Sequence, residues 1–165
     1  MRNLLLLFSV LLLFMSCTTE NIDDDALLNL ENDTNEIILE DKPFEIEIMN
    51  LINEYRVDKG LTPLEKQNGI VKLKAKEHNM YMIKKSAISH DLFYERSNNI
   101  IKKIKAKRVG ENVASGYNNA ERLVNAWIAS PKHKKNILGD FNKFNISVEF
   151  SQNKVMYCTN IFIKK

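Results

Sequence analysis

The residues with the clearest chemical potential lie in and around a short glycine-bracketed run, Val109–Gly116. The run contains one carboxylate, Glu111, and two of the chain's three histidines, His90 and His133, flank it at similar distances. Imidazole and carboxylate groups can bind a divalent metal ion or transfer protons. Because no two of these three residues lie within one helical turn, their spacing alone does not indicate a metal site. Glycine permits close backbone approach or a positive φ, so we predict that Glu111 lies on a tightly turned segment.

Length and charge indicate one basic domain behind an acidic segment. A chain of 165 residues with 44% hydrophobic residues can bury a single core. Between Glu20 and Glu47 there are eleven acidic residues and one base, Lys42, whereas from Asn50 onward 22 Lys and Arg face 10 Asp and Glu. The acidic part favours a solvated tether and the basic part a folded domain. For an exported basic domain, anionic lipid or an envelope polymer is a more natural partner than nucleic acid.

The N-terminus has the pattern of a secretory signal. Arg2 precedes an apolar run that extends to Met15 and is too short to span a bilayer. Cys17 follows a small residue, which is similar to the processing site of bacterial lipoproteins; an ordinary signal peptide with an incidental cysteine is the alternative. We therefore predict a signal peptide over residues 1–16, a lipidated Cys17 with an acidic linker over 17–42, and the domain over 43–165. Cys158 then has no partner for a disulfide.

The hydrophobic pattern predicts a mixture of helices and strands in the domain. Lys72, Lys74, Lys76 and Lys84 are assigned to a solvent-facing side of their helix, and His78 is interpreted as a packed or capping residue. Trp127 is expected in a buried stripe. The lysine-rich end of the helix over 93–104 is typical of a solvated face, with an anionic contact as the alternative. We expect helices over residues 43–60, 68–85, 93–104 and 120–129, a helical turn over 133–138, and strands over 144–150 and 154–163.

Three motifs occur in a specific order along the chain. Ser89-His90 is followed by GENVASG at Gly110–Gly116 and then by W-x-x-S-P-x-H-x-x-N-I-L at Trp127–Leu138. Each motif is weak alone, but the ordered set resembles the CAP superfamily, or SCP domain, and in particular its bacterial branch. The resemblance extends from about Leu51 to Phe162. It implies an α+β fold built as a three-layer α–β–α sandwich.

The resemblance also implies a site. It places His90, Glu111, Ser130 and His133 in one cleft, and in some family members the two histidines hold a divalent metal. Zinc or another divalent ion is therefore the implied cofactor, with His90, His133 and Glu111 as ligands. Ser130 stands where the animal and plant branches have a second acid, and a serine hydroxyl is a poor zinc ligand at neutral pH. Glu111 has a second interpretation, as a structural carboxylate that accepts backbone hydrogen bonds from its turn.

Three functions remain open from the sequence. The favoured one is a secreted, lipid-anchored binding module whose cleft takes a lipid, a cell-envelope component or a host molecule. The alternatives are a metal-assisted hydrolase and an interaction protein with a vestigial cleft. No serine lies in a recognisable nucleophile motif, so we favour a protein that is not an enzyme. The expected location is the cell envelope, anchored by lipid to the outer membrane or cell surface.

We predict that Cys17 carries the lipid anchor. Cells fed a labelled fatty acid should incorporate label into the wild-type protein and not into Cys17→Ala, because the thiol is the acceptor. Equal labelling of the two proteins, or none in either, would show that the anchor does not exist.

Overall fold

The computed structural model describes residues 39–165. The predicted signal peptide, Cys17 and most of the linker lie outside these residues. The elements in chain order are α2 (Pro43–Asp58), β1 (Glu65–Lys66), α3 (Ile70–Lys85), α4 (Phe93–Ile104), β2 (Arg108–Ser115), α5 (Ala120–Ala129), α6 (Pro131–Ile137), β3 (Lys143–Phe150) and β4 (Met156–Lys164). Among them, no helix has the length and apolar character needed to cross a membrane.

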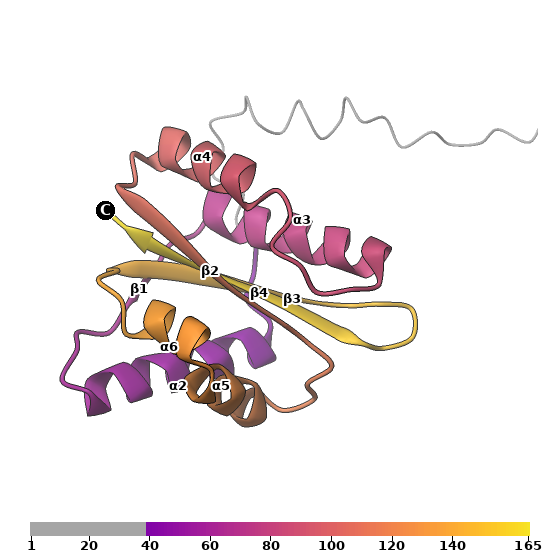
Figure 1. Ribbon diagram of the computed structural model, residues 1–165, viewed down its shortest axis with the longest axis horizontal. Coiled ribbons are helices and arrows are strands. Elements are labelled where there is room, and N and C mark those ends of the chain that lie inside the picture. The colour runs from indigo at the N-terminus through magenta and orange to yellow at the C-terminus, as the bar shows by residue number, and fades with distance from the viewer. Residues whose placement is uncertain (1–38) are drawn as a thin grey trace, which may run out of the picture. The chain divides into compact units, whose positions relative to one another are not determined.

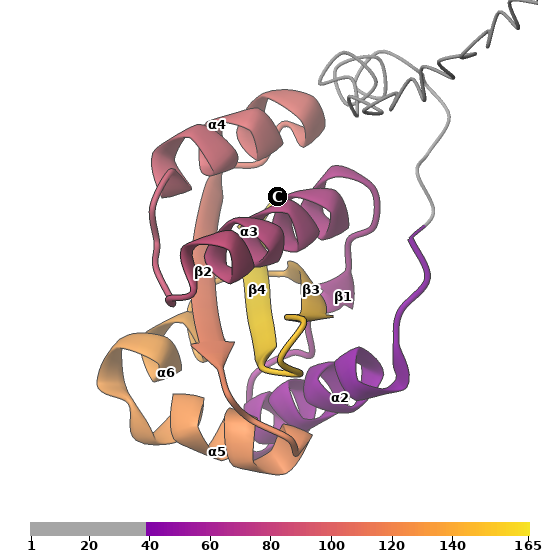
Figure 2. The same ribbon diagram turned by 90° about the vertical axis from the view of Figure 1, so that its right-hand side faces the viewer.

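A four-stranded mixed sheet separates two helical layers, as Figures 1 and 2 show. The strand order is β1-β3-β4-β2, with β4 antiparallel to both β3 and β2, and β1 parallel to the start of β3. Helices α3 and α4 cover one face, and α2, α5 and α6 cover the other. The α–β–α sandwich is therefore confirmed. Strand β4 is central, as predicted, and its residues are buried through Ile163 because it has neighbours on both edges and both faces.

The main core lies between the sheet and the layer of α2 and α5. Trp127 and Leu123 of α5 pack there with Phe144 and Phe162 of the sheet, all almost fully buried. The indole Nε1 of Trp127 donates a hydrogen bond of 3.2 Å to the carbonyl of Val113 in β2. The predicted burial of Trp127 is thus confirmed, and its polar atom has the partner that a buried indole requires.

Most element boundaries agree with the sequence pattern, but the glycine-bracketed run does not. Residues 108–115 form strand β2, paired with β4 along its whole length, so the prediction of a tight turn carrying Glu111 is wrong. Its two glycines act differently. Gly110 leaves room for the ring of Phe141, which a Cβ would approach to 2.8 Å, and Gly116 turns the chain with φ of 81°. Helix α6 begins at Pro131 rather than at His133, since proline is well suited to a first helical position.

The outer edge of β3 is covered by side chains. Because β1 pairs only with Lys143 and Phe144, the backbone of β3 beyond this point has no neighbouring strand on that side among residues 39–165. Lys72 Nζ donates to the carbonyl of Ile146 at 2.7 Å, and Glu45 accepts from the amide of Val148 at 2.7 Å. These contacts satisfy polar groups that an edge strand would otherwise expose or bury without partners.

The assignment of Lys72 and Lys74 to a solvent-facing side of α3 is wrong, because both are buried. Lys72 Nζ lies 2.7 Å from Glu45 and 3.0 Å from Asp41, so its charge is compensated inside the protein. Lys74 pairs with Glu77 at 2.9 Å. A charged residue in a helix predicts a solvent-facing position only if no oppositely charged side chain packs against it in the folded protein.

We predict that Lys72→Met destabilises the protein strongly. Removing the ammonium leaves Glu45 buried without its cation, which costs about 3–5 kcal/mol of unfolding free energy. The double variant Lys72→Met/Glu45→Gln should be more stable than Lys72→Met alone, because it removes both charges and keeps an acceptor for Val148. Urea unfolding of the two variants and the wild type measures this; a single variant as stable as the wild type would show that the pair contributes nothing.

Candidate functional site

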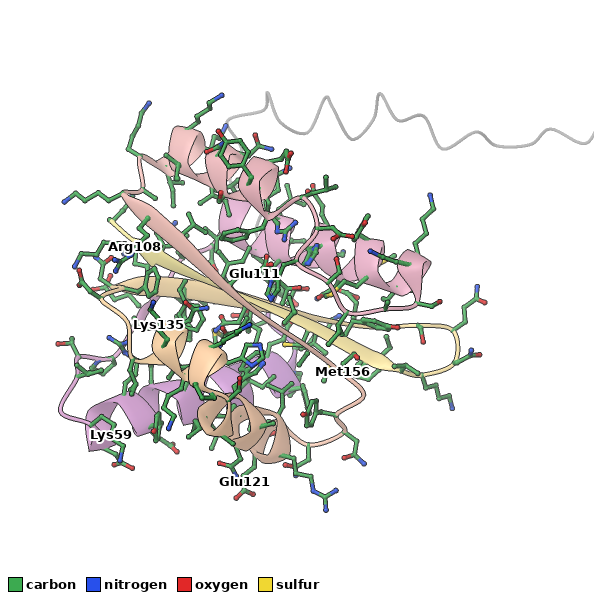
Figure 3. The ribbon with its side chains drawn as sticks, viewed as in Figure 1. Lys59, Arg108, Glu111, Glu121, Lys135 and Met156 are labelled. Atoms are coloured by element: carbon green, nitrogen blue, oxygen red, sulfur yellow. The ribbon has the colours of Figure 1, made fainter. Side chains whose placement is uncertain are left out.

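Glu111 is held by a bidentate contact with an arginine. The carboxylate points from β2 toward the layer of α3 and α4, and its side chain is 1% exposed. Arg96 of α4 donates from Nε to Oε2 at 2.8 Å and from Nη2 to Oε1 at 2.9 Å. A planar guanidinium matches a carboxylate in this arrangement and neutralises it, which makes the buried charge tolerable. The label of Glu111 in Figure 3 lies over the sheet, between the two helical layers.

The same carboxylate orients His90. His90 Nδ1 lies 2.8 Å from Glu111 Oε1, while the imidazole remains 53% exposed. Since the ionised carboxylate only accepts hydrogen bonds, Nδ1 must carry the proton and donate it. In the neutral ring, Nε2 is then the free acceptor. A carboxylate on one ring nitrogen, with the other nitrogen free, is the arrangement that prepares a histidine to bind a metal ion or a ligand proton.

A network around the α3–α4 loop fixes the position of His90. His78 Nε2 donates to the carbonyl of Ser89 at 2.8 Å, and Arg96 Nη1 donates to the carbonyl of Asp91 at 3.1 Å. The carboxylate of Asp91 accepts from Tyr81 at 2.8 Å and from Lys85. Hydrogen bonds from Lys85, Tyr81 and Ser89 lower the pKa of Asp91 to about 2. The loop is therefore held on both sides of His90.

His78 is packed, as the sequence interpretation proposed, and it also contacts the site. It is almost fully buried on α3, and its Nε2 lies 3.8 Å from Glu111 Oε1. Burial lowers the pKa of His78, and the nearby Arg96 acts in the same direction against the opposing influence of Glu111. The imidazole is thus neutral near pH 7 and serves as a structural donor to the loop.

His133 lies on α6, in the opposite helical layer, and reaches the same edge of the sheet. Asn112 is the neighbour of Glu111 on β2 but points to the other face, where its Nδ2 donates to the carbonyl of His133 at 3.2 Å. Asn136 of α6 donates to the carbonyl of Glu111 at 2.9 Å and to Asn112 Oδ1 at 2.8 Å. Strand β2 is an edge strand, so the α3–α4 loop and α6 approach it from its two faces (Figure 2).

The pKa of His133 responds to its burial and to the charge of His90. Burial lowers the pKa of His133, and positive charge on His90 lowers it further. The ring of His133 is partly buried, 6.3 Å from the indole of Trp127 between ring centroids. The neutral imidazole, which is the form that binds metals, is therefore favoured at His133.

The predicted cleft residues are thus divided between two groups. His90 and Glu111 form a direct hydrogen bond. His133 belongs to the opposite layer, and positive charge on His90 lowers its pKa. Ser130 lies at the junction of α5 and α6, where its backbone caps the two helices. The hydroxyl of Ser130 does not cap α6 by a hydrogen bond. That Ser130 lies in a cleft stays a prediction.

Arg96 is the site residue that sequence reasoning missed. It is one basic residue in a helix that ends in several lysines, and nothing in its neighbourhood distinguishes it from a solvated side chain. The available signal was the buried acid: a carboxylate on a strand between two helical layers needs a fixed cation. Arg96 supplies this cation from a position fifteen residues before Glu111 in the chain. It lies on α4, the helix that follows the loop with His90.

The donor set fits a divalent ion in part. Two imidazoles, with His90 oriented by a carboxylate, are suitable ligands. Glu111 fits better as the orienting group than as a ligand, because both of its oxygens already accept hydrogen bonds. Within residues 39–165 no cluster of three or more His, Cys, Asp or Glu is arranged to hold a metal.

We predict that stability falls as the medium becomes acidic. His78 and His133 have lowered pKa values when folded, so the unfolded chain binds more protons, and the unfolding free energy decreases as pH drops below about 6.5. His78→Gln removes one of these groups and should reduce the slope of unfolding free energy against pH. Urea unfolding at a series of pH values gives both slopes, and equal slopes would show that His78 does not titrate between the two states.

Comparison with solved structures supports the fold. An outer surface protein from Borrelia burgdorferi is 26% identical, with a TM-score of 0.67, and the match covers 77% of this chain and 96% of that one. A cysteine-rich secretory protein from Staphylococcus aureus is 24% identical with a TM-score of 0.60, covering 78% of this chain and 41% of that one. An extracellular SCP-domain protein from Bacillus anthracis is 23% identical with a TM-score of 0.62, and the match covers 74% of this chain and 40% of that one. The first of these is described as an outer surface protein, the second as a secretory protein and the third as an extracellular protein.

A comparison with curated protein sequences gives no match. The model of the cysteine-rich secretory protein family, CAP, matches residues 49–162. This range is most of the chain and contains β2 with Glu111, the loop with His90 and the helix with His133. The chain therefore belongs to the cysteine-rich secretory protein (CAP) family.

Proposed function

We propose that this protein is a lipid-anchored binding module of the cell envelope, which holds its ligand through His90 and His133. The observation that carries the proposal is the chain of contacts from Arg96 through Glu111 to His90. The buried, neutralised carboxylate fixes the imidazole of His90 with Nε2 free and half of the side chain exposed. A structural histidine would use both nitrogens internally or be buried, as His78 is.

The ligand class follows from what two imidazoles can recognise. Neutral imidazole nitrogens bind a divalent ion, or accept a hydrogen bond from a hydroxyl or a protonated acid. Two protein ligands hold zinc weakly, so any bound ion would be completed by water or by the organic ligand. A lipid headgroup, an envelope component or a host molecule with such groups suits the site. Glu111 as a third direct ligand stays a prediction.

In the part of the chain that the structure describes, no specific contact favours the hydrolase alternative. Glu111 has both oxygens engaged, so it is not a free base, and within the described residues no hydroxyl is hydrogen-bonded to a histidine ring. Cys158 is a core residue of β4, and burial raises the pKa of its thiol well above the usual range. Glu111 orients His90, and neither Glu111 nor Cys158 is arranged as a nucleophile.

We predict that zinc binds weakly at neutral pH and that both histidines are required. Calorimetric titration of zinc, used as the probe, should show most binding lost in His90→Ala and in His133→Ala. The double variant should be little worse than either single variant, since one ion shared by two ligands gives non-additive losses. Binding should weaken below about pH 6.5, where free imidazole protonates, although the lowered pKa of His133 delays its own protonation.

Two further variants make the titration decisive. Arg96→Lys keeps the charge but loses the bidentate fork, so zinc binding should fall although no ligand has been removed. Lys135→Ala alters an exposed residue of α6, the helix that carries His133, and should leave binding unchanged. Unchanged affinity in both histidine variants would end the metal proposal and leave an organic ligand as the occupant.

A further inference from the structure

The two helical layers carry very different charge. Between Ile70 and Lys107, which spans α3 and α4, there are ten Lys and Arg against three Asp and Glu, a net charge of +7. Residues 43–58 and 120–137, which form the opposite layer, together hold five of each and are neutral. The basic character of the domain is therefore concentrated on one side of the sheet, seen above the strands in Figure 1.

Part of this positive charge has no counterpart within the described residues. Lys72, Lys74 and Lys85 pair with acids and contribute to the fold. The remaining lysines of the two helices are exposed and form no ion pair in the described part of the chain: Lys76, Lys84, Lys102 and Lys103. Unpaired ammonium groups on one face attract an anionic surface at short range and are screened by salt.

Exposed apolar side chains occur in the same helical layer as these lysines. Half of the large hydrophobic residues that are exposed in the described structure fall between Met80 and Tyr94. Ile88 and Leu92 are 54% and 58% exposed in the α3–α4 loop, and Tyr94 at the start of α4 is 73% exposed. Leu92 also has a φ of 58°, a left-handed conformation that a non-glycine residue keeps only when its surroundings impose it. The loop thus presents apolar groups to solvent under conformational constraint.

We propose that the layer of α3 and α4 is a second membrane contact, which docks directly on an anionic lipid surface. Unpaired lysines in one layer with exposed Leu, Ile and Tyr are the combination that partitions into a bilayer interface: the cations meet acidic headgroups, and the apolar groups enter the headgroup boundary. The inference rests on the proposed envelope location and is independent of what the histidines bind.

Docking of this layer has a consequence for His90. His90 lies between Ile88 and Leu92 in the same loop, and it is half-exposed. Contact of the loop with lipid would therefore place the free nitrogen of His90 at the level of the headgroups. The anchor would then fix the distance of the domain from the membrane, while the α3–α4 layer would fix its orientation.

Vesicle sedimentation tests the proposal. The probe is vesicles of phosphatidylcholine alone or with about 30% phosphatidylglycerol, and the protein is the chain after the predicted lipid site, residues 18–165, so that no acyl chain contributes. We expect binding to the anionic vesicles at low salt, little binding to the neutral ones, and a marked loss at about 0.5 M salt.

A matched pair of variants separates a specific surface from overall charge. Lys102→Glu/Lys103→Glu alters α4, and Lys132→Glu/Lys135→Glu alters exposed lysines of α6 in the opposite layer by the same charge. The α4 pair should weaken partitioning about tenfold or more, and the α6 pair should have little effect. Ile88→Ser/Tyr94→Ser should reduce the binding that survives at high salt. Thermal unfolding of each variant checks that the fold is kept.

Two outcomes would overturn the proposal. Equal losses from the α4 and α6 pairs would show that net charge alone drives binding. No binding of the wild type to the anionic vesicles would show that the exposed face has another role. Neither result alters the zinc titration, so failure of the membrane contact and failure of the histidine site can be told apart.

Discussion

The site depends on a buried carboxylate that has been given a fixed positive partner. An isolated glutamate between a sheet and a helix would lose its hydration and become protonated or force the layers apart. The bidentate contact with Arg96 removes this penalty and leaves the carboxylate ionised with directed lone pairs. One of these oxygens then acts on His90. The geometry of an exposed imidazole is thus set by electrostatics in the interior.

The edge position of β2 explains how two helical layers contribute to one candidate site. Adjacent residues of a strand point to opposite faces, so Glu111 reaches the α3–α4 side while Asn112 reaches α6. If β2 were a central strand, a further strand would lie between Glu111 or Asn112 and the solvent at this edge. At the edge, the loop above and the short helix below approach the same border, and Asn136 binds the strand's free carbonyl. A single strand therefore organises histidines that are far apart in the chain.

Much of this fold is predictable because it follows from local patterns. The bounds of α4 and α5 and the central position of β4 agree with hydrophobic spacing, and Trp127 is buried as its stripe indicates. The ordered motifs indicate the family, and the family model confirms it. Strand β2 was missed because glycine, glutamate and asparagine resemble a turn until the strand beside them is known. Lys72 and Arg96 were missed because burial of a charge depends on a partner distant in sequence.

The contacts at the start of the domain also determine how it would respond to tension. Lys42 donates to the carbonyl of Val148 and pairs with Glu149, while Asp41 binds Lys66 and Lys72. A pull on the chain from its N-terminal side would reach the domain first at these two residues. The load would pass sideways into β3 and α3 through several ionic and hydrogen-bonded contacts acting together, rather than peel one helix turn by turn. A domain held by a tether at this end would thus meet mechanical stress at a group of charged contacts by the β3 edge of the sheet, opposite the β2 edge that carries Glu111.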